Sequence, residues 1–136
     1  MRKITHLVVH CTGTEASATI EGIKRYWKDV LDWKNPGYHF IVKPSGEIVQ
    51  LLDIAIPSNG VKGKNSTLIN ICYIGGLNAL KQHKDTRTPQ QKESILKKLK
   101  QLKGQFPAAI IQGHRDFPGV IKSCPCFNAK AEYANL

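Results

Sequence analysis

Three short apolar runs, widely spaced along the chain, are the feature that most constrains its fold. They lie at residues 4–10, 69–75 and 107–112 and are rich in β-branched side chains. Apolar runs of this length, bounded by Gly, Pro or polar residues, predict buried strands. Segments with helical periodicity lie between them, and this alternation favours a sheet with helices packed on it. We therefore expect an α/β fold with a mixed central β-sheet flanked by helices.

Two helices are predicted between these strands. The first covers residues 17–33, where apolar residues recur at helical spacing and Ser or Thr is available as the N-cap. The second begins at Thr88, because Thr-Pro-Gln-Gln has the pattern of a capping box, and it ends at Gly104. Four apolar residues form the stripe that this helix is expected to bury: Ile95, Leu96, Leu99 and Leu102.

The remaining segments predict a hairpin, a loop and a short terminal helix. Residues 38–43 and 47–51 flank a Pro-Ser-Gly turn and form the hairpin. Residues 57–67 lack periodicity and form the loop, and the tail from residue 124 holds the short helix. Because the chain shows no repeat, linker or low-complexity segment, residues 1–136 are expected to form a single domain.

The chain is strongly basic, with 20 Lys and Arg residues against 10 Asp and Glu residues and a net charge of +10. This balance favours polyanionic partners such as nucleic acid, an anionic membrane surface or an acidic wall polymer. Eight basic and two acidic residues lie within 81–103, which predicts a solvated helix face there. Because the chain lacks a nucleic-acid motif and an apolar stretch of about 20 residues, we expect neither specific nucleic-acid binding nor membrane insertion. We also expect a monomer.

The cysteines and the N-terminal run bear on the compartment. The first apolar run is too short, and too soon interrupted by His6 and His10, for a secretory signal. We therefore expect synthesis in the cytoplasm without a signal peptide, where a disulfide framework is not favoured. Cys124 and Cys126 are too close in sequence to pair comfortably with each other, so at least one of the four cysteines has a candidate chemical role.

Two histidines each follow an apolar strand directly, and a cysteine follows the second of them. His10 ends the first predicted strand, His114 follows the last one, and Cys124 lies in a loop shortly after it. The ends of adjacent strands converge on one edge of a sheet. Two imidazoles and one thiolate form a known catalytic zinc set with one open position. From spacing alone, a single histidine at a strand end is more often a structural or solvent-facing residue than a metal ligand.

Four short motifs occur together in one order: residues 8–12 (Val-Val-His-Cys-Thr), 37–40 (Gly-Tyr-His-Phe), 113–116 (Gly-His-Arg-Asp) and 122–125 (Lys-Ser-Cys-Pro). Together they resemble the zinc-dependent N-acetylmuramoyl-L-alanine amidases of the phage lysozyme and peptidoglycan recognition protein family, amidase type 2. The resemblance covers the chain from residue 4 to about residue 127. It implies a fold like that of this family, which agrees with the mixed sheet expected above.

The resemblance also implies roles for individual residues. His10, His114 and Cys124 fall on the metal ligands and would hold one zinc ion. Tyr38 matches the tyrosine beside the metal-bound water, and Lys122 matches the lysine that stabilises the oxyanion. The implied enzyme is a hydrolase of bacterial peptidoglycan that cleaves the amide between N-acetylmuramic acid and L-alanine. Zinc would lower the pKa of the attacking water toward ~7.

Some positions depart from the family pattern or have a second interpretation. Asn59 occupies the place of a family histidine in the loop and is a candidate substrate-binding residue. Cys126 has no role in the pattern and competes with Cys124, which we prefer because it precedes proline. Tyr38 is alternatively a strand aromatic whose hydroxyl only finds a partner. His39 is expected to point to the opposite face of its strand and to be structural.

Two other functions remain open at this point. One is a non-catalytic peptidoglycan-binding module on the same fold, although Cys124 argues against it. The other is a nucleic-acid binder driven by charge, which we rank last. The favoured interpretation is a phage or prophage endolysin that reaches the cell wall after release by lysis or dedicated export. Arg115 and Asp116 are expected to brace the loop that carries His114, and Asp116 is also a candidate hydrogen-bond acceptor for His114, because metal-bound histidines usually have such a partner.

Overall fold

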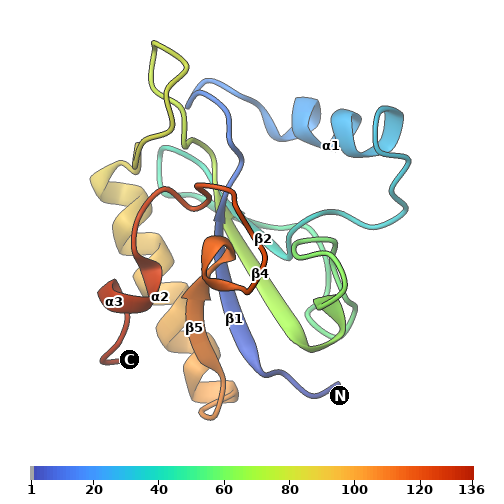
Figure 1. Cartoon of the computed structure of the whole chain (residues 1–136), viewed down its shortest axis with the longest axis vertical. Helices are drawn as coiled ribbons and strands as arrows, with labels where there is room; N and C mark the ends of the chain where they lie inside the picture. Colours follow the sequence, from blue (N-terminus) through green and yellow to red (C-terminus); the bar gives the residue numbers. More distant parts are fainter. Residues whose placement is uncertain (1) are drawn as a thin grey trace.

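A five-stranded mixed sheet lies at the centre of the molecule, which the computed structural model describes for residues 2–136 (Figure 1). The strands lie in the order β3-β2-β4-β1-β5. Their bounds are β1 (His6–Cys11), β2 (Phe40–Val42), β3 (Ile48–Gln50), β4 (Leu68–Tyr73) and β5 (Ile110–Gly113). Neighbouring strands are parallel except for β2 and β3, which form the antiparallel hairpin. The structure thus confirms the mixed sheet, the hairpin and the three buried strands.

Three helices accompany the sheet: α1 (Ile20–Asp29), α2 (Pro89–Gln105) and α3 (Ala129–Glu132). Thr19 is the N-cap of α1, and its side chain accepts a hydrogen bond from the backbone of Gly22. The predicted capping box at Thr88 is present at the start of α2. Helix α1 is shorter than the predicted 17–33, since its last apolar residues are exposed and the chain turns with a left-handed residue, Asp32 (φ 54°). Helix α2 continues one residue beyond Gly104.

The two faces of the sheet are covered differently. In Figure 1, α2 lies behind the sheet, and the buried side chains on that side belong to the main hydrophobic core together with α3. Because successive residues of a strand point to opposite faces, Leu7 and Val9 enter this core, while Val8 and His10 point to the other face. A smaller cluster that includes Ile20 of α1 covers part of that second face. The polar residue His10 therefore lies on the less thickly covered side.

The buried stripe of α2 differs from the predicted one at two positions, because it lacks Leu96 and contains Gln91. Leu96 is 36% exposed, whereas Gln91 is 1% exposed. The Gln91 side chain donates 3.1 Å hydrogen bonds to the carbonyl oxygens of Val42 and Ile74, so its amide is satisfied inside the core. The observed stripe is Gln91, Ile95, Leu99 and Leu102. The prediction for Leu96 was wrong, because this residue lies about 100° around the helix from Ile95 and outside the stripe that faces the sheet.

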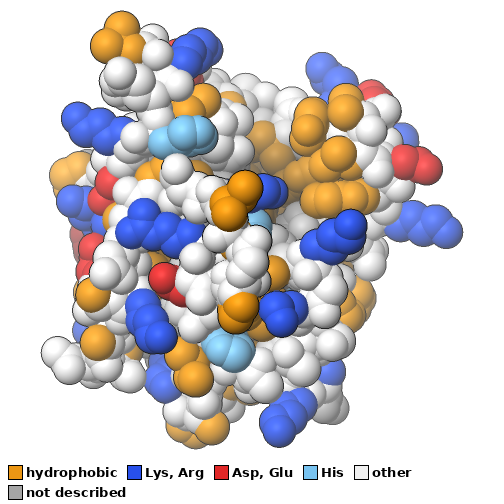
Figure 2. Space-filling model, viewed as in Figure 1, with side chains coloured by type: hydrophobic (Ala, Val, Ile, Leu, Met, Phe, Trp, Pro, Cys, Tyr) orange, Lys and Arg blue, Asp and Glu red, His pale blue; other side chains and the backbone are white. Residues whose placement is uncertain are grey.

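The basic charge is distributed over the surface, with one exception. The lysines of α2 are exposed or half-buried, as predicted, and Figure 2 shows that Lys and Arg also far outnumber Asp and Glu on the face turned away from α2. Arg87 lies within residues 81–103, for which the sequence predicts a solvated face, but it is buried at 7% exposure. It forms ion pairs with Asp85 and Glu132, which explain its burial. None of the helices within residues 2–136 is long and apolar enough to cross a membrane.

Candidate metal centre

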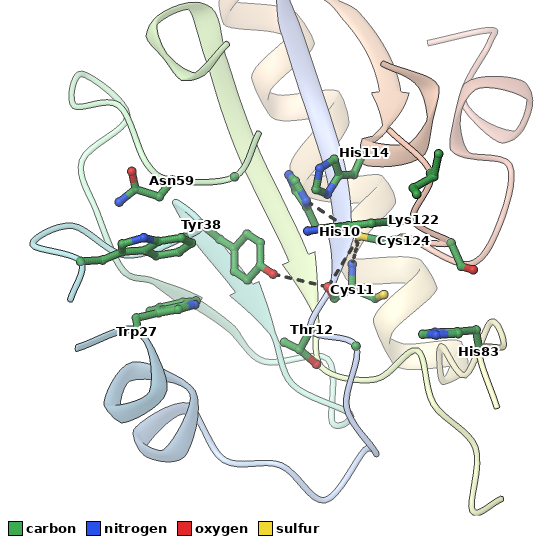
Figure 3. Close-up of a pocket in the computed structure, with 16 residues that line it drawn as sticks. His10, Cys11, Thr12, Trp27, Tyr38, Asn59, His83, His114, Lys122 and Cys124 are labelled. Carbon is green, nitrogen blue, oxygen red and sulfur yellow. Dashed lines mark hydrogen bonds between the residues drawn. The ribbon is translucent and has the colours of Figure 1, made fainter. Parts of the chain in front are cut away.

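Three side chains with metal-binding atoms converge at the carboxyl edge of the sheet. His10, His114 and Cys124 each offer one donor atom, and these atoms lie within 4.8 Å of one another. They line a cavity of about 360 Å³ (Figure 3). The structure thus brings together the three residues that the sequence singled out as zinc ligands.

The strand pattern explains why the two histidines meet. β1 and β5 are parallel neighbours, so the C-terminal ends of both strands lie at the same edge of the sheet. His10 is the penultimate residue of β1, and His114 opens the short 3-10 turn that follows β5. Their ring centroids are 4.9 Å apart. Convergence at one edge is the arrangement that the sequence predicted.

Both imidazoles are held in their neutral form. Burial is the main cause that lowers the pKa of His10 to about 4, and burial likewise lowers the pKa of His114 to about 4. Two cations side by side would also repel each other, and the nearby Lys122 adds to this effect. A neutral imidazole carries the lone pair that a metal ion needs.

The thiol of Cys124 is stabilised in its charged form. Hydrogen bonding with the side chain of Cys11 lowers the pKa of Cys124 and outweighs the opposing effect of burial. The backbone N–H of Cys11 also donates to Cys124 Sγ at 3.2 Å. A low pKa favours the thiolate, which is the form that binds zinc.

The donor set fits zinc in type and spacing. Nδ1 of His10 and Sγ of Cys124 are 3.9 Å apart. Zinc bond lengths of ~2.0–2.3 Å place tetrahedral donors about 3.5 Å from one another. Two neutral imidazoles and one thiolate leave the fourth tetrahedral position free for a reactant, as in catalytic zinc sites.

Hydrogen bonds from the sheet and its loops position the segment that carries Cys124. Tyr73 of β4 donates to the carbonyl oxygen of Pro125 at 2.6 Å, and the backbone N–H of Arg115 donates to the carbonyl oxygen of Cys124 at 2.9 Å. Asp116 was predicted as an acceptor for the ring of His114. Its carboxylate instead accepts from a backbone N–H of the same loop, at Gly113. Asp116 therefore braces the His114 loop, as expected, and its carboxylate bonds to the backbone instead of the imidazole.

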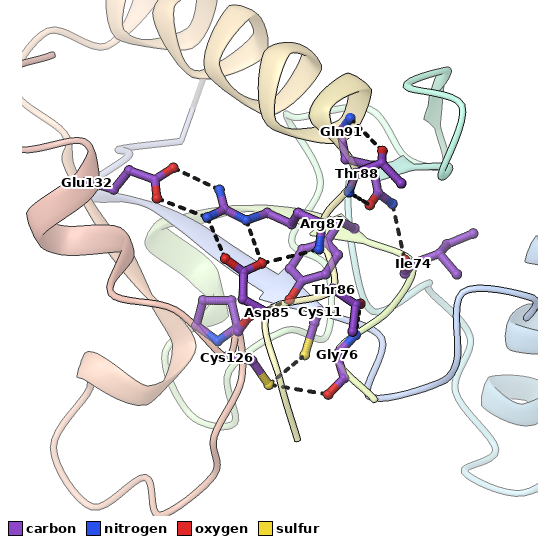
Figure 4. A network of polar contacts seen from close by, with 12 residues as sticks. Cys11, Ile74, Gly76, Asp85, Thr86, Arg87, Thr88, Gln91, Cys126 and Glu132 are labelled. Atoms are coloured by element: carbon purple, nitrogen blue, oxygen red, sulfur yellow. Dashed lines mark hydrogen bonds and ion pairs between the residues drawn. The ribbon is translucent and has the colours of Figure 1, made fainter. Parts of the chain in front are cut away.

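The buried guanidinium of Arg87 holds the segment that follows Cys124 (Figure 4). Arg87 donates two hydrogen bonds of 2.9 Å to Asp85, and hydrogen bonds of 2.8 and 2.9 Å to Glu132 of α3. Its guanidinium also lies over the ring of Phe127, 3.3 Å from the centroid. Because Phe127 and Glu132 follow Cys124 closely in the chain, this network anchors the C-terminal tail to the loop before α2.

The other predicted site residues also line the cavity (Figure 3). Tyr38 lies with its ring centroid 5.1 Å from that of His10, and its hydroxyl donates to the carbonyl oxygen of Cys11 at 3.4 Å. Lys122 is exposed at the rim. Asn59 donates from Nδ2 to the carbonyl oxygen of Asn35 at 2.9 Å.

His39, which was expected to be structural, and Cys126, which competed with Cys124 as a ligand, both lie outside the donor set. His39 is fully buried, and its Nε2 lies 2.7 Å from the carbonyl oxygen of Ile56, which fits the structural role expected for it. Cys126 turns its sulfur toward the carbonyl oxygen of Gly76 and lies 3.9 Å from the sulfur of Cys11. All four cysteines carry free thiols.

Sequence reasoning missed several residues of the site. Asn70 contacts His10 directly, with 2.7 Å between Oδ1 and Nε2. Its signal in the sequence was a single amide within an apolar strand. Trp27 and Trp33 stack at a centroid distance of 6.4 Å and line the cavity, as does His83. The helical periodicity of residues 17–33 does not set Trp27 apart from the other apolar residues there, and no pattern distinguishes His83.

Comparison with known proteins agrees with this geometry. The family model described as N-acetylmuramoyl-L-alanine amidase matches residues 1–127. An endolysin of Enterobacteria phage K11 is 33% identical over 129 residues, which cover 93% of this chain and 83% of the relative. An endolysin of Klebsiella phage KP32 is 31% identical over 131 residues, covering 95% and 85%.

Solved structures show the same fold. The N-acetylmuramoyl-L-alanine amidase LysC from Clostridium intestinale superposes with a TM-score of 0.80 at 23% identity, covering 96% of this chain and 82% of LysC. The Drosophila peptidoglycan recognition protein SD superposes with a TM-score of 0.79 at 14% identity, covering 100% and 82%. From the family match and the phage relatives, the chain belongs to the N-acetylmuramoyl-L-alanine amidase family and is an amide hydrolase of that class.

Proposed function

We propose that the chain binds one zinc ion through His10, His114 and Cys124 and uses it to cleave peptidoglycan between N-acetylmuramic acid and L-alanine. The observation that carries this proposal is the convergence of three donor atoms within 4.8 Å in a cavity of an amidase fold. A zinc ion in such a site supplies a hydroxide nucleophile near neutral pH and polarises the carbonyl that is attacked.

Tyr38 and Lys122 supply the two hydrogen-bond donors that the reaction needs beside the three proposed zinc ligands. Burial raises the pKa of Tyr38, so its hydroxyl stays protonated and acts as a hydrogen-bond donor. In this role it orients the reacting water or the substrate carbonyl, or passes a proton onward. The ammonium of Lys122 at the rim stabilises negative charge as it develops on the carbonyl oxygen.

The hollows around the site suit a substrate that extends on both sides of the cleaved bond, as a glycan strand on one side and a peptide on the other do. A second hollow of about 860 Å³ adjoins the first, and Trp33, Asn59 and His114 line both. Aromatic side chains provide flat apolar surface for a sugar ring, while amides bind its polar groups. Because Nδ2 of Asn59 is engaged by Asn35, its Oδ1 is the atom that we propose contacts the substrate.

We further propose that residues 1–136 act as one monomeric domain on the bacterial cell wall, as an endolysin after release from the cytoplasm. The two phage relatives, which are 33% and 31% identical to this chain, are endolysins, and this supports the role on the cell wall. The non-catalytic binding module is not favoured, because none of the three donor residues has been lost.

The direct test combines metal analysis with identification of the cleaved bond. Purified protein is expected to contain one zinc ion per chain and to release new L-alanine amino termini from isolated peptidoglycan. A chelator should abolish the release, and added zinc should restore it. Reducing ends without new amino termini would assign a different bond, and zinc-loaded protein that binds walls without cleaving them would support the binding module.

A further inference from the structure

One amide side chain, Asn70, is buried in the middle of β4. It is 0% exposed and lies on the face of the sheet that also carries His10. A buried amide costs free energy unless its donors and its acceptor are bonded. Oδ1 of Asn70 lies 2.7 Å from Nε2 of His10, and its Nδ2 lies 2.8 Å from Oγ of Ser58. The amide is therefore satisfied on both sides, with one side on a proposed metal ligand.

Backbone groups fix the roles of the two ring nitrogens of the neighbouring His39, because a backbone N–H only donates and a carbonyl oxygen only accepts. The backbone N–H of Asn70 donates to Nδ1 of His39 at 3.0 Å, and Nε2 of His39 donates to the carbonyl oxygen of Ile56 at 2.7 Å. Ser58 Oγ lies 3.4 Å from the same ring nitrogen, whose single lone pair already accepts the backbone N–H of Asn70. The Ser58 oxygen accepts from Asn70 Nδ2 at 2.8 Å. Oδ1 of Asn70 is left to accept the Nε2 proton of His10.

The space for this amide depends on a glycine in the facing loop. A Cβ added at Gly60 would overlap the amide group of Asn70. Gly60 also lines the cavity next to the donor atoms. The loop and the strand are thus matched: the missing side chain at Gly60 makes room for the one that contacts His10.

We infer that Asn70 is a positioning residue which holds His10 in the tautomer with Nδ1 unprotonated and turned toward the metal. This inference rests on the zinc binding proposed above. Nδ1 is the ring nitrogen that faces Cys124 Sγ, at 3.9 Å, while Nε2 faces Asn70. A partner on the far nitrogen orients a metal-bound imidazole, and its loss typically lowers metal affinity about 10- to 100-fold.

Zinc affinity, measured by competition between the protein and a chromophoric chelator, tests this role. Asn70→Leu has nearly the same shape but no acceptor, and its zinc Kd is expected to rise about 10- to 100-fold. Asn70→Asp keeps an acceptor oxygen and should restore most of the affinity. Ile71→Val alters the opposite face of the same strand, so it controls for lost core packing and should keep the wild-type Kd.

Two further measurements keep the inference open to refutation if Asn70→Leu does not fold. Gly60→Ala is expected to displace the Asn70 amide and to weaken zinc binding. Long-range ¹H–¹⁵N NMR of the metal-free wild-type protein should show the proton of His10 on Nε2. A proton on Nδ1, or a folded Asn70→Leu variant with the wild-type zinc Kd, would overturn the inference alone. Wild-type protein that binds no zinc would overturn the proposed function along with it.

Discussion

Tyr73 Oη donates a 2.6 Å hydrogen bond to the carbonyl oxygen of Pro125, joining the central strand β4 to the segment that carries Cys124. Both residues are buried. Tyr73→Phe keeps the ring but leaves the buried carbonyl without this donor, which should cost about 1–3 kcal/mol of unfolding free energy. We also expect weaker zinc binding, because Cys124 loses a restraint. Urea denaturation and zinc competition measure the two effects. Tyr26→Phe, on an exposed tyrosine, should change neither of them.

The two neighbouring cysteines should respond differently to substitution. Cys124→Ser removes the thiolate donor, and zinc affinity should fall by at least about 100-fold, the upper range for losing only an outer hydrogen-bond partner. The fold should persist, because the site lies at the edge of the sheet. Cys126→Ser is the matched control, since its sulfur faces Gly76 and Cys11 rather than the histidines. Metal analysis of both variants decides the ligand, and selective loss in Cys126→Ser would reassign it.

Local signals in the sequence predicted most of the fold. The strands were recognisable because each is a short apolar run, and the start of α2 because its capping residues lie within four positions. The interior of α2 was harder, because Gln91 fits the helical period of the stripe but is polar. Its burial depends on the carbonyl oxygens of Val42 and Ile74, which belong to segments distant in the chain. Periodicity alone does not contain that information.

In the candidate site, too, local patterns predicted some residues, while other contacts depend on tertiary structure. His10, His114 and Cys124 were singled out by strand ends and by motif order, and the structure brings them together. The contact between His10 and Asn70 joins residues 60 positions apart, and it depends on the register of two parallel strands. The burial of Arg87 likewise depends on a carboxylate 45 positions away. Such pairings follow from tertiary structure and leave no local pattern.

Lys122→Ala should slow hydrolysis far more than it weakens wall binding. An ammonium that stabilises charge only as the carbonyl oxygen becomes negative contributes about 10²–10³-fold to turnover. Wall binding in a sedimentation assay should change little, and Lys122→Arg should recover part of the rate. Lys97→Ala removes an exposed lysine of α2 far from the cavity and controls for the change in net charge. Equal losses of binding and turnover in Lys122→Ala would make Lys122 a binding residue instead.

The ion pairs around Arg87 predict a loss of stability in acid. Hydrogen bonds from Arg87 lower the pKa of Glu132. Burial alone would raise the pKa of Asp85, but the hydrogen bonds from Arg87 outweigh it, so that pKa is lowered as well.

Because these folded-state pKa values lie below the unfolded values of ~4, the stabilisation is complete above that pH and is lost as the pH falls through the folded-state pKa values. The unfolding free energy should therefore decrease from about pH 5 downward. Glu132→Gln should give a shallower decrease in urea denaturation at a series of pH values, because one of the protonating groups is gone. Glu93→Gln, on the exposed side of α2, serves as the control. A Glu132→Gln profile parallel to that of the wild type would contradict the linkage between this network and acid stability.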